Sequence, residues 1–152
     1  MLNEGQDPGK AVPPRKRRAL GAALVVEDDA LIAMDIAEAL AEAGADPVVV
    51  CPSIAEAMDA LAQTMPALLV LDVHLADRDD GWALAELAMQ LSETPPQIIF
   101  TTGTPESIPA SAAQLGHVLA KPFRTRDLIS IVERERGGGL LGRIRDALSN
   151  RS

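Results

Sequence analysis

Short apolar runs alternate along the chain with longer segments in which apolar residues recur every three or four positions. The runs are Leu24–Val26, Val48–Cys51, Leu68–Asp72, Ile98–Gly103 and Val118–Ala120. Runs of this length, bounded by Gly, Pro or charged residues, are typical of strands buried on both faces of a sheet. Strands that alternate with helices predict a parallel α/β sheet, and right-handed crossovers would cover both of its faces with helices.

The helical segments carry their own start and stop signals. Gly44 ends the first predicted helix, and Ser53 opens the second with the form of a capping box. Pro109 is expected to make the helix after Thr104 short or irregular, and Thr125 is expected to cap the last helix. The residues expected to face the core are Ile32, Ile36, Leu40 and Ala43 in the first helix, Ala57, Met58, Leu61 and Ala62 in the second, and Leu128, Ile131 and Val132 in the last.

At 152 residues the chain fits one domain of ordinary size with a tail at each end. We expect residues 1–21 to form a disordered basic arm, because they are rich in Gly and Pro, carry the cluster Arg15–Arg18 and show no apolar period. Residues 22–136 form the predicted globular domain. Residues 137–152 are expected to be a Gly-rich linker followed by a short amphipathic helix.

The net charge of −8 conceals an uneven distribution of charged residues. Residues 23–132 contain four Lys and Arg residues against seventeen Asp and Glu residues, whereas both ends of the chain are basic. An acidic domain repels the phosphodiester backbone, and Trp82, Phe100 and Phe123 are the only aromatic residues that could stack on bases. We therefore expect no direct DNA binding by this domain.

Cysteine content and hydropathy bear on the cellular compartment. The single cysteine, Cys51, cannot form an internal disulfide bond, and it is expected to be a small core residue. The apolar run from Ala19 to Val26 is too short for a membrane span and continues directly into acidic residues, which argues against a signal peptide. We expect a cytoplasmic protein with no membrane association.

Polar residues of unusual kinds stand at the carboxyl ends of the predicted strands. Asp72 follows the third strand, Glu27 and Asp28 the first, Thr102 the fourth and Lys121 the fifth. Because carboxyl ends of parallel strands meet at one edge of a doubly wound sheet, these side chains are expected to form a single cluster. Carboxylates suit Mg²⁺, Lys supplies a positive charge, and a threonine hydroxyl can donate to a phosphoryl oxygen. The set suits phosphoryl transfer to Asp72, which would give an aspartyl phosphate.

Four motifs in this order resemble the receiver domain of two-component response regulators over roughly residues 22–135. They are Leu24-Val25-Val26-Glu27-Asp28, Leu69-Val70-Leu71-Asp72, Phe100-Thr101-Thr102-Gly103 and Ala120-Lys121-Pro122-Phe123. The resemblance implies a flavodoxin-like, doubly wound sheet of five parallel strands in the order 2-1-3-4-5. The Phe-x-Thr-Gly signature on the fourth strand is further similar to a subgroup of receivers in which output is read differently.

The resemblance also implies a role for each site residue. Asp72 would be the phosphoacceptor and Thr102 the switch hydroxyl, preferred over Thr101 because the small Gly103 follows it. Lys121 would pair with the phosphoryl group and precede a cis peptide bond to Pro122. The implied Mg²⁺ ligands are Glu27, Asp28, Asp72 and the backbone carbonyl of His74, with the His74 imidazole as the less favoured alternative.

The implied partners are a histidine kinase or histidine phosphotransfer protein as phosphoryl donor and an unknown output protein. Roughly twenty residues after the last predicted helix of the sheet are too few for a DNA-binding or catalytic output domain, so we expect output through a protein contact. The sequence leaves a homodimer open. The expected function is that of a phosphoacceptor switch and not of a turnover enzyme.

The chain departs from the common receiver pattern at two positions. Val118 stands where the family usually has Tyr or Phe, and Ala76 stands where Pro is common, in a loop that looks one residue longer than usual.

Two other functions are alternatives to the phosphoacceptor switch. The first is a pseudo-receiver without phosphotransfer, against which the complete set of polar residues argues. The second is a phosphatase or mutase similar to the haloacid dehalogenase family, whose nucleophile normally follows the first strand and precedes an acid by two residues. Here Asp72 follows the third strand and precedes His74. For single residues the alternatives are a turn cap at Asp72 and a solvated helix start at Glu27–Asp29.

Overall fold

The computed structural model describes residues 20–137, which form one sheet flanked by helices. The strands are β2 (Gly21–Val26), β3 (Ala45–Cys51), β4 (Leu68–Asp72), β5 (Gln97–Thr102) and β6 (His117–Ala120). The helical elements are α2 (Ala30–Glu42), α3 (Ile54–Thr64), α4 (Trp82–Leu91), the 3₁₀ turn η1 (Pro105–Ser107), α5 (Ala110–Ala113) and α6 (Thr125–Gly137). The expected N-terminal arm and the expected C-terminal linker and helix lie, except for residues 20, 21 and 137, outside the described residues.

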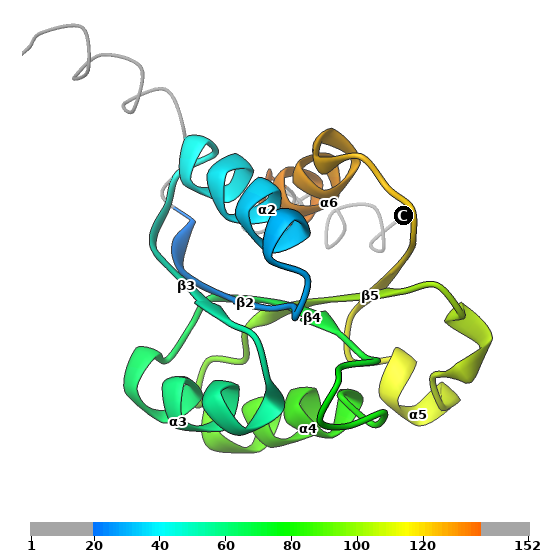
Figure 1. The fold of residues 1–152 in the computed structure, drawn as a ribbon. Helices are drawn as coiled ribbons and strands as arrows, with labels where there is room; N and C mark the ends of the chain where they lie inside the picture. Colours follow the sequence, from blue (N-terminus) through cyan, green and yellow to red (C-terminus); the bar gives the residue numbers. More distant parts are fainter. Residues whose placement is uncertain (1–19, 138–152) are drawn as a thin grey trace, which may run out of the picture.

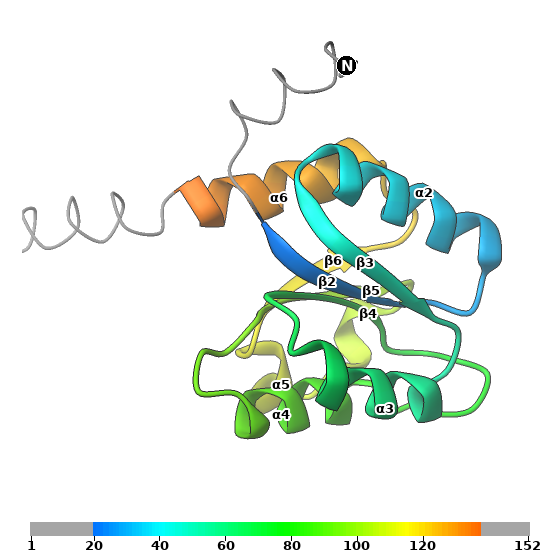
Figure 2. The same cartoon turned by 90° about the vertical axis from the view of Figure 1, so that its left-hand side faces the viewer.

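The five strands are all parallel and lie in the order β3-β2-β4-β5-β6. This is the predicted order 2-1-3-4-5, so the flavodoxin-like sheet is confirmed. Helices α2 and α6 cover one face, whereas α3, α4 and α5 cover the other (Figures 1 and 2). After β2 the chain forms β3 on one side of β2, and it then forms β4 on the other side. In a sheet of this kind the ligand crevice lies where the direction of the strand order reverses, outside the carboxyl ends of β2 and β4.

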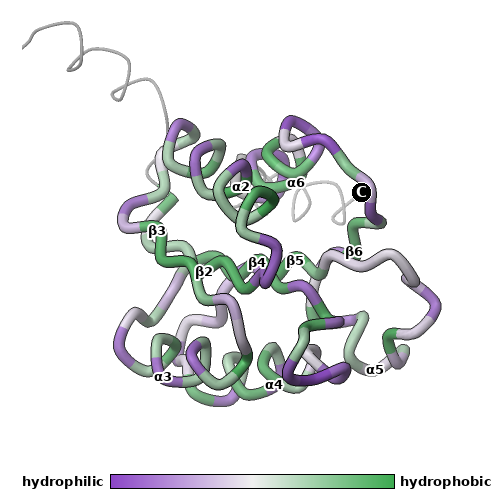
Figure 3. The backbone as a smooth tube through the Cα atoms, in the orientation of Figure 1, coloured by the Kyte–Doolittle hydropathy of each residue, from purple (hydrophilic) through white to green (hydrophobic). Residues whose placement is uncertain are grey.

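Each face of the sheet has its own hydrophobic core, because successive strand residues point to opposite sides. Leu24 and Val26 of β2 pack under α3 and α4, whereas Val25 and Val70 pack under α2 and α6. The central strands are largely hydrophobic, whereas several of the turns between the elements are hydrophilic (Figure 3). Phe100 is completely buried in the α3–α4 core, which otherwise consists mainly of aliphatic side chains.

The helix ends follow the predicted signals in most places. Gly44 follows α2 with a φ of +115°, a conformation that favours glycine. The Ser53 hydroxyl accepts a hydrogen bond from the Glu56 N–H (3.2 Å) at the start of α3. Thr125 is not the expected cap, because it is already the first residue of α6. The residue before the helix is Arg124, and its N–H donates to Asp127 Oδ2 (3.4 Å).

The predicted core positions are mostly confirmed, with an error on α3. Met58 is 44% exposed and Ala62 is also exposed, because the buried face of α3 is the narrow row Ile54, Ala57 and Leu61. Cys51 is buried, as expected. The predicted irregular segment around Pro109 consists of η1 and the four-residue α5. Among the described residues, no helix is long and apolar enough to span a membrane.

Candidate functional site

The predicted phosphoacceptor lies at the carboxyl end of β4, in the crevice of the sheet. Asp72 is the last residue of β4 and only 4% exposed. Its Oδ1 accepts a hydrogen bond from the His74 backbone N–H (3.0 Å), and its Oδ2 accepts one from Lys121 Nζ (2.9 Å). Lys121 follows β6, 49 residues further along the chain. The structure therefore joins the predicted acceptor and the predicted lysine in one ion pair, and the peptide bond between Lys121 and Pro122 is cis, as predicted.

The acidic run after β2 divides into three different environments. Glu27 is buried (2% exposed), and its Oε1 accepts a second hydrogen bond from Lys121 Nζ (3.1 Å). Asp28 is exposed, and its Oδ2 accepts from the Ala76 N–H (3.0 Å). Asp29 caps α2 by accepting from the N–H groups of Leu31 (3.0 Å) and Ile32 (3.1 Å). The alternative of a helix start thus holds for Asp29, whereas Glu27 and Asp28 join Asp72.

Burial and neighbouring charges shift the pKa values of Glu27 and of Lys121. Burial raises the pKa of Glu27, and the Asp72 carboxylate raises it further, although hydrogen bonds from the Asp29 N–H and from Lys121 act in the opposite direction. Burial alone would lower the pKa of Lys121, but its hydrogen bonds to Asp72 and Glu27 outweigh burial and raise it. Lys121 is therefore a cation held between two carboxylates.

The three carboxylates fit a hard divalent cation. Glu27, Asp28 and Asp72 each offer an oxygen, and these oxygens lie within 4.8 Å of one another. Lys121 supplies one positive charge against three negative ones, so the cluster keeps an excess of negative charge. Two of its three carboxylates, those of Glu27 and Asp72, are buried. Mg²⁺ binds few carboxylates and retains several waters, which suits a cluster whose third member, Asp28, faces solvent. The donor set thus fits the expected Mg²⁺.

The two threonines at the end of β5 are both buried but differ in their contacts. Thr101 is paired in register with Asp72, and its carbonyl accepts from the Val73 N–H (3.2 Å). The Thr102 hydroxyl accepts from the Thr104 N–H (2.9 Å). The Thr102 carbonyl accepts from the Lys121 N–H (2.7 Å), which ties this strand end to the lysine. Thr102 thus adjoins the site through the backbone, and its assignment as the switch hydroxyl stays a prediction.

His74 contributes to the site mainly through its backbone, and its imidazole extends elsewhere. Its Nε2 lies 2.9 Å from Ser107 Oγ and 3.0 Å from Thr104 Oγ1, so the ring contacts the segment that follows β5. The Thr104 and Ser107 hydroxyls also bond to each other (3.2 Å). An imidazole engaged by these hydroxyls is poorly suited to bind a metal, which favours the backbone carbonyl among the two predicted His74 ligands.

Two glycines border the site, and only one of them allows a close approach of the backbone. A Cβ atom on Gly81 would lie 2.9 Å from the Asp72 carbonyl oxygen and 2.9 Å from Val73 Cα. Gly103, the small residue that follows Thr102, has open space where a Cβ would stand. The glycine that packs against the backbone of Asp72 is therefore Gly81, at the end of the loop that Asp72 begins.

Sequence reasoning missed Asp77, a carboxylate in the same loop that contacts α3. Its two carboxylate oxygens accept from the Ile54 and Ala55 N–H groups at 3.1 to 3.3 Å. The sequence places Asp77 in a polar loop, but it gives no signal for which helix a loop carboxylate contacts. The Thr104 and Ser107 contacts with His74 were missed for the same reason, since they join residues 30 and 33 positions apart.

Comparisons with known sequences agree with this geometry. The family described as the response regulator receiver domain matches residues 23–133. The transcriptional regulatory protein PdtaR of Mycobacterium tuberculosis is 33% identical over 135 residues, which are 88% of this chain and 62% of that protein. The phyllosphere-induced regulator PhyR of Methylorubrum extorquens is 30% identical over 112 residues, which are 72% of this chain and 41% of that protein. The chain thus spans less than two thirds of the length of these relatives.

Solved structures show the same fold. The crystal structure of NtrX from Brucella abortus superimposes with a TM-score of 0.67 at 26% identity, and covers 87% of this chain and 31% of that one. A CheY-like receiver domain from Methylobacillus flagellatus superimposes with a TM-score of 0.67 at 24% identity, covering 76% and 98% of the two chains, which supports the fold alone. Together with the motifs at the strand ends and the family match over most of its length, these comparisons show that the chain belongs to the response regulator receiver domain family.

Proposed function

We propose that Asp72 accepts a phosphoryl group from a phosphohistidine donor in a Mg²⁺-dependent reaction, and that the phosphorylated domain acts through contact with another protein. The observation that carries the proposal is the ion pair of a buried carboxylate with Lys121 beside two further carboxylates. Burying several like charges together costs free energy, and such clusters are typical of functional sites. The cytoplasm, where histidine kinases expose their phosphohistidine, is the proposed location.

The side chains of the site divide the tasks of phosphoryl transfer. An Asp72 oxygen attacks phosphorus in line while the bond from phosphorus to the donor imidazole nitrogen breaks. The electron pair of that bond stays on the imidazole nitrogen, which takes up a proton. Lys121 already contacts the acceptor at 2.9 Å and can donate to an incoming phosphoryl oxygen. A bound Mg²⁺ would neutralise phosphoryl charge and would be held by Glu27, Asp28 and Asp72.

The direct test uses a small phosphoryl donor and the intact protein. After incubation with acetyl phosphate and Mg²⁺, mass spectrometry should show the addition of one phosphoryl group to the wild type and none to Asp72→Ala. Asp79→Ala is the matched control, because Asp79 lies in the same loop with a side chain that is 93% exposed, and it should accept as the wild type does. An unchanged uptake by Asp72→Ala would refute the assignment of the acceptor. Absence of uptake by the folded wild type would favour the pseudo-receiver.

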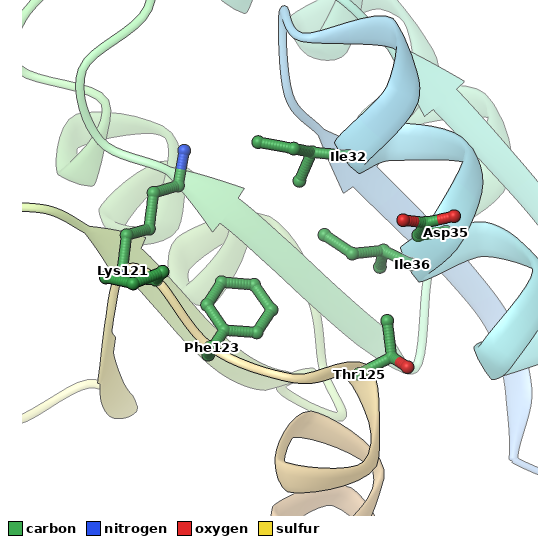
Figure 4. A pocket seen from close by; sticks show the side chains of 7 residues that line it. Ile32, Asp35, Ile36, Lys121, Phe123 and Thr125 are labelled. Atoms are coloured by element: carbon green, nitrogen blue, oxygen red, sulfur yellow. The ribbon is translucent and has the colours of Figure 1, made fainter.

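An apolar surface beside the site suits the docking of the proposed protein donor. A cavity of about 440 Å³ lies between α2 and the segment after β6, with Ile32 and Ile36 facing Phe123 across it and Lys121 at its edge (Figure 4). On the same helix Leu31 is 76% and Met34 is 58% exposed. A donor must cover the carboxyl edge of the sheet to bring its phosphohistidine to Asp72, and exposed apolar side chains of this size mark contact surfaces. We therefore assign the phosphoryl donor to this side of the molecule.

Leu31→Glu should separate a protein donor from a small one. Uptake from acetyl phosphate should stay within about twofold of wild type, whereas transfer from a phosphorylated histidine kinase or histidine phosphotransfer protein should fall by about tenfold or more, as for an apolar contact residue of an interface. Met58→Glu is the matched control, since Met58 is also an exposed apolar residue (44%) but lies on α3, which covers the opposite face of the sheet (Figure 1). An equal loss in both variants would place the donor elsewhere.

A further inference from the structure

We propose that Asp77 is a positioning residue for the metal site: it ties the loop after β4 to α3, so that this loop holds the Asp28 carboxylate in place. The proposal rests on the proposed function, because it concerns the same Mg²⁺ site. Asp77 itself is not among the three carboxylates that share a cluster. Its effect would therefore be transmitted through the loop.

The first step is the contact between Asp77 and the start of α3. The N-terminus of a helix leaves backbone N–H groups without partners, and a carboxylate there also interacts favourably with the helix dipole. Asp77 Oδ2 accepts from Ile54 N–H (3.1 Å) and Ala55 N–H (3.3 Å), and Oδ1 accepts from Ile54 N–H (3.3 Å). Ser53 Oγ accepts from the next N–H, that of Glu56. Two residues thus share the capping of α3, and Asp77 comes from a loop 23 positions away.

The second step is the closed turn on which Asp77 stands. The Leu75 N–H donates to the Arg78 carbonyl (2.9 Å) and the Arg78 N–H donates back to the Leu75 carbonyl (3.2 Å). Ala76 and Asp77 lie between these two residues, so they cannot move independently of each other. Fixing Asp77 on α3 therefore also fixes the position of the Ala76 N–H.

The third step leads from the turn to the metal ligand. The Ala76 N–H donates to Asp28 Oδ2 (3.0 Å), and Asp28 is the exposed member of the carboxylate cluster. An exposed carboxylate samples several rotamers, and ordering it on metal binding costs conformational entropy. A hydrogen bond from a fixed backbone N–H reduces this cost, as groups behind a metal ligand generally do. The chain of contacts from α3 through Asp77 and Ala76 therefore prepares Asp28 for the cation.

The test compares two ways of removing a cap from the same helix. Asp77→Ala removes the cap that also holds the loop, whereas Ser53→Ala removes the cap that does not. Mg²⁺ is titrated into each full-length variant, with binding followed by calorimetry and by the fluorescence of Trp82, the single tryptophan, which begins α4 directly after the loop. We expect Asp77→Ala to weaken Mg²⁺ binding by about tenfold, the lower end of the range for groups that orient metal ligands. Ser53→Ala should bind like wild type.

Two further variants show whether Asp77 affects the Mg²⁺ affinity through its hydrogen bonds to α3 or through its negative charge. Asp79→Ala removes one negative charge from the same loop at a side chain that is 93% exposed, and it should leave the Mg²⁺ affinity within about twofold of wild type. Asp77→Asn also removes the charge, but its amide oxygen can still accept from the Ile54 N–H, so it should regain most of the affinity lost in Asp77→Ala. Thermal unfolding should report a comparable loss of stability in Asp77→Ala and Ser53→Ala.

The outcomes separate this proposal from the proposed function. If the wild type binds Mg²⁺ and Asp77→Ala binds it equally well, or if Ser53→Ala loses as much affinity as Asp77→Ala, Asp77 is only a helix cap and the positioning role is refuted. If Asp79→Ala loses as much affinity as Asp77→Ala, the effect is one of charge, and the positioning role is likewise refuted. If the wild type itself binds no Mg²⁺, the metal site of the proposed function fails, and the positioning role fails with it.

Discussion

The loop after β4 (residues 73–81) and the segment after β5 (residues 103–109) start from neighbouring strands at the same edge of the sheet, but they are held in different ways. The β4 loop is fixed by backbone donors and carboxylates from other parts of the chain: Ala76 contacts Asp28, and Asp77 contacts α3. At its end, Gly81 packs against the backbone of Asp72 with no space for a methyl group. Its geometry therefore leaves little room for rearrangement.

The segment after β5 is anchored in the core by Ile108, and its side-chain hydrogen bonds are made by neutral hydroxyls. The Thr104 N–H bonds to the hydroxyl of Thr102, and the Thr104 and Ser107 hydroxyls bond to each other and to the His74 imidazole. Gly103, at its start, has open space around it. Such hydrogen bonds are individually weak and exchange readily with water.

This difference suggests how the two loops divide the work of a switch. The proposed acceptor and the proposed metal ligands need a fixed frame, which the β4 loop provides. If the Thr102 hydroxyl turns to a phosphoryl group on Asp72, the Thr104 N–H loses its partner, and the segment after β5 can adopt another arrangement. Val118, which is partly buried against the α3–α4 core, stands where the family usually has Tyr or Phe, so we expect the change to pass through the hydroxyl contacts with His74.

The largest effect on stability is expected from Gly81→Ala. Its new Cβ would stand 2.9 Å from backbone atoms of both Asp72 and Val73, which cannot move aside as a flexible side chain would. We expect the free energy of unfolding to fall by about 1–3 kcal/mol, as for other overpacked positions, with weaker Mg²⁺ binding because Asp72 is displaced. Denaturant unfolding and Mg²⁺ titration measure the two effects.

Gly103→Ala is the matched control for this substitution. A Cβ on Gly103 meets no atom within 4 Å, so the free energy of unfolding should change by no more than about 0.5 kcal/mol. If both alanine variants lost the same stability, the two segments would be equally constrained and the comparison would fail.

The sequence could predict the sheet and the members of the site, because both depend on local patterns. Apolar runs such as Leu68–Asp72 end at the residue where the structure ends the strand, and the clustered groups all stand at the ends of β2, β4 and β6. Position at a strand end is enough to predict clustering, since all parallel strands end at the same edge. The strand order and the cis bond before Pro122 followed from the resemblance to receivers, and both are present.

The sequence could not predict contacts that depend on where loops lie in space. Nothing local distinguishes Asp77, which caps α3, from its neighbour Asp79, whose side chain is 93% exposed. The same holds for Gly81 and Gly103, since both are glycines in polar segments near strand ends, and only the packing around them tells which one must lack a side chain. The inward direction assigned to Met58 failed because a helix of three turns buries a narrower face than its apolar residues suggest.

The smallest effects are expected from removing hydroxyls of the segment after β5, and they should remain local. Thr104→Val deletes the hydroxyl that contacts His74 but keeps the N–H that bonds to Thr102, and Ser107→Ala deletes the second hydroxyl near the imidazole. Because each contact is a neutral hydrogen bond near solvent, amide hydrogen exchange of Thr104 and of residues 106–108 should accelerate by about two- to fivefold. Exchange of residues 75–81 should stay unchanged, since their N–H groups donate to Asp28, to Val73 and to each other, and none of these contacts involves the deleted hydroxyls. Asp77→Ala should show the reverse pattern, with faster exchange at residues 54, 55 and 76 and none of the change at residues 104–108. Equal acceleration of both segments in all three variants would mean that His74 couples them into one unit, and that the two loops respond to phosphorylation together.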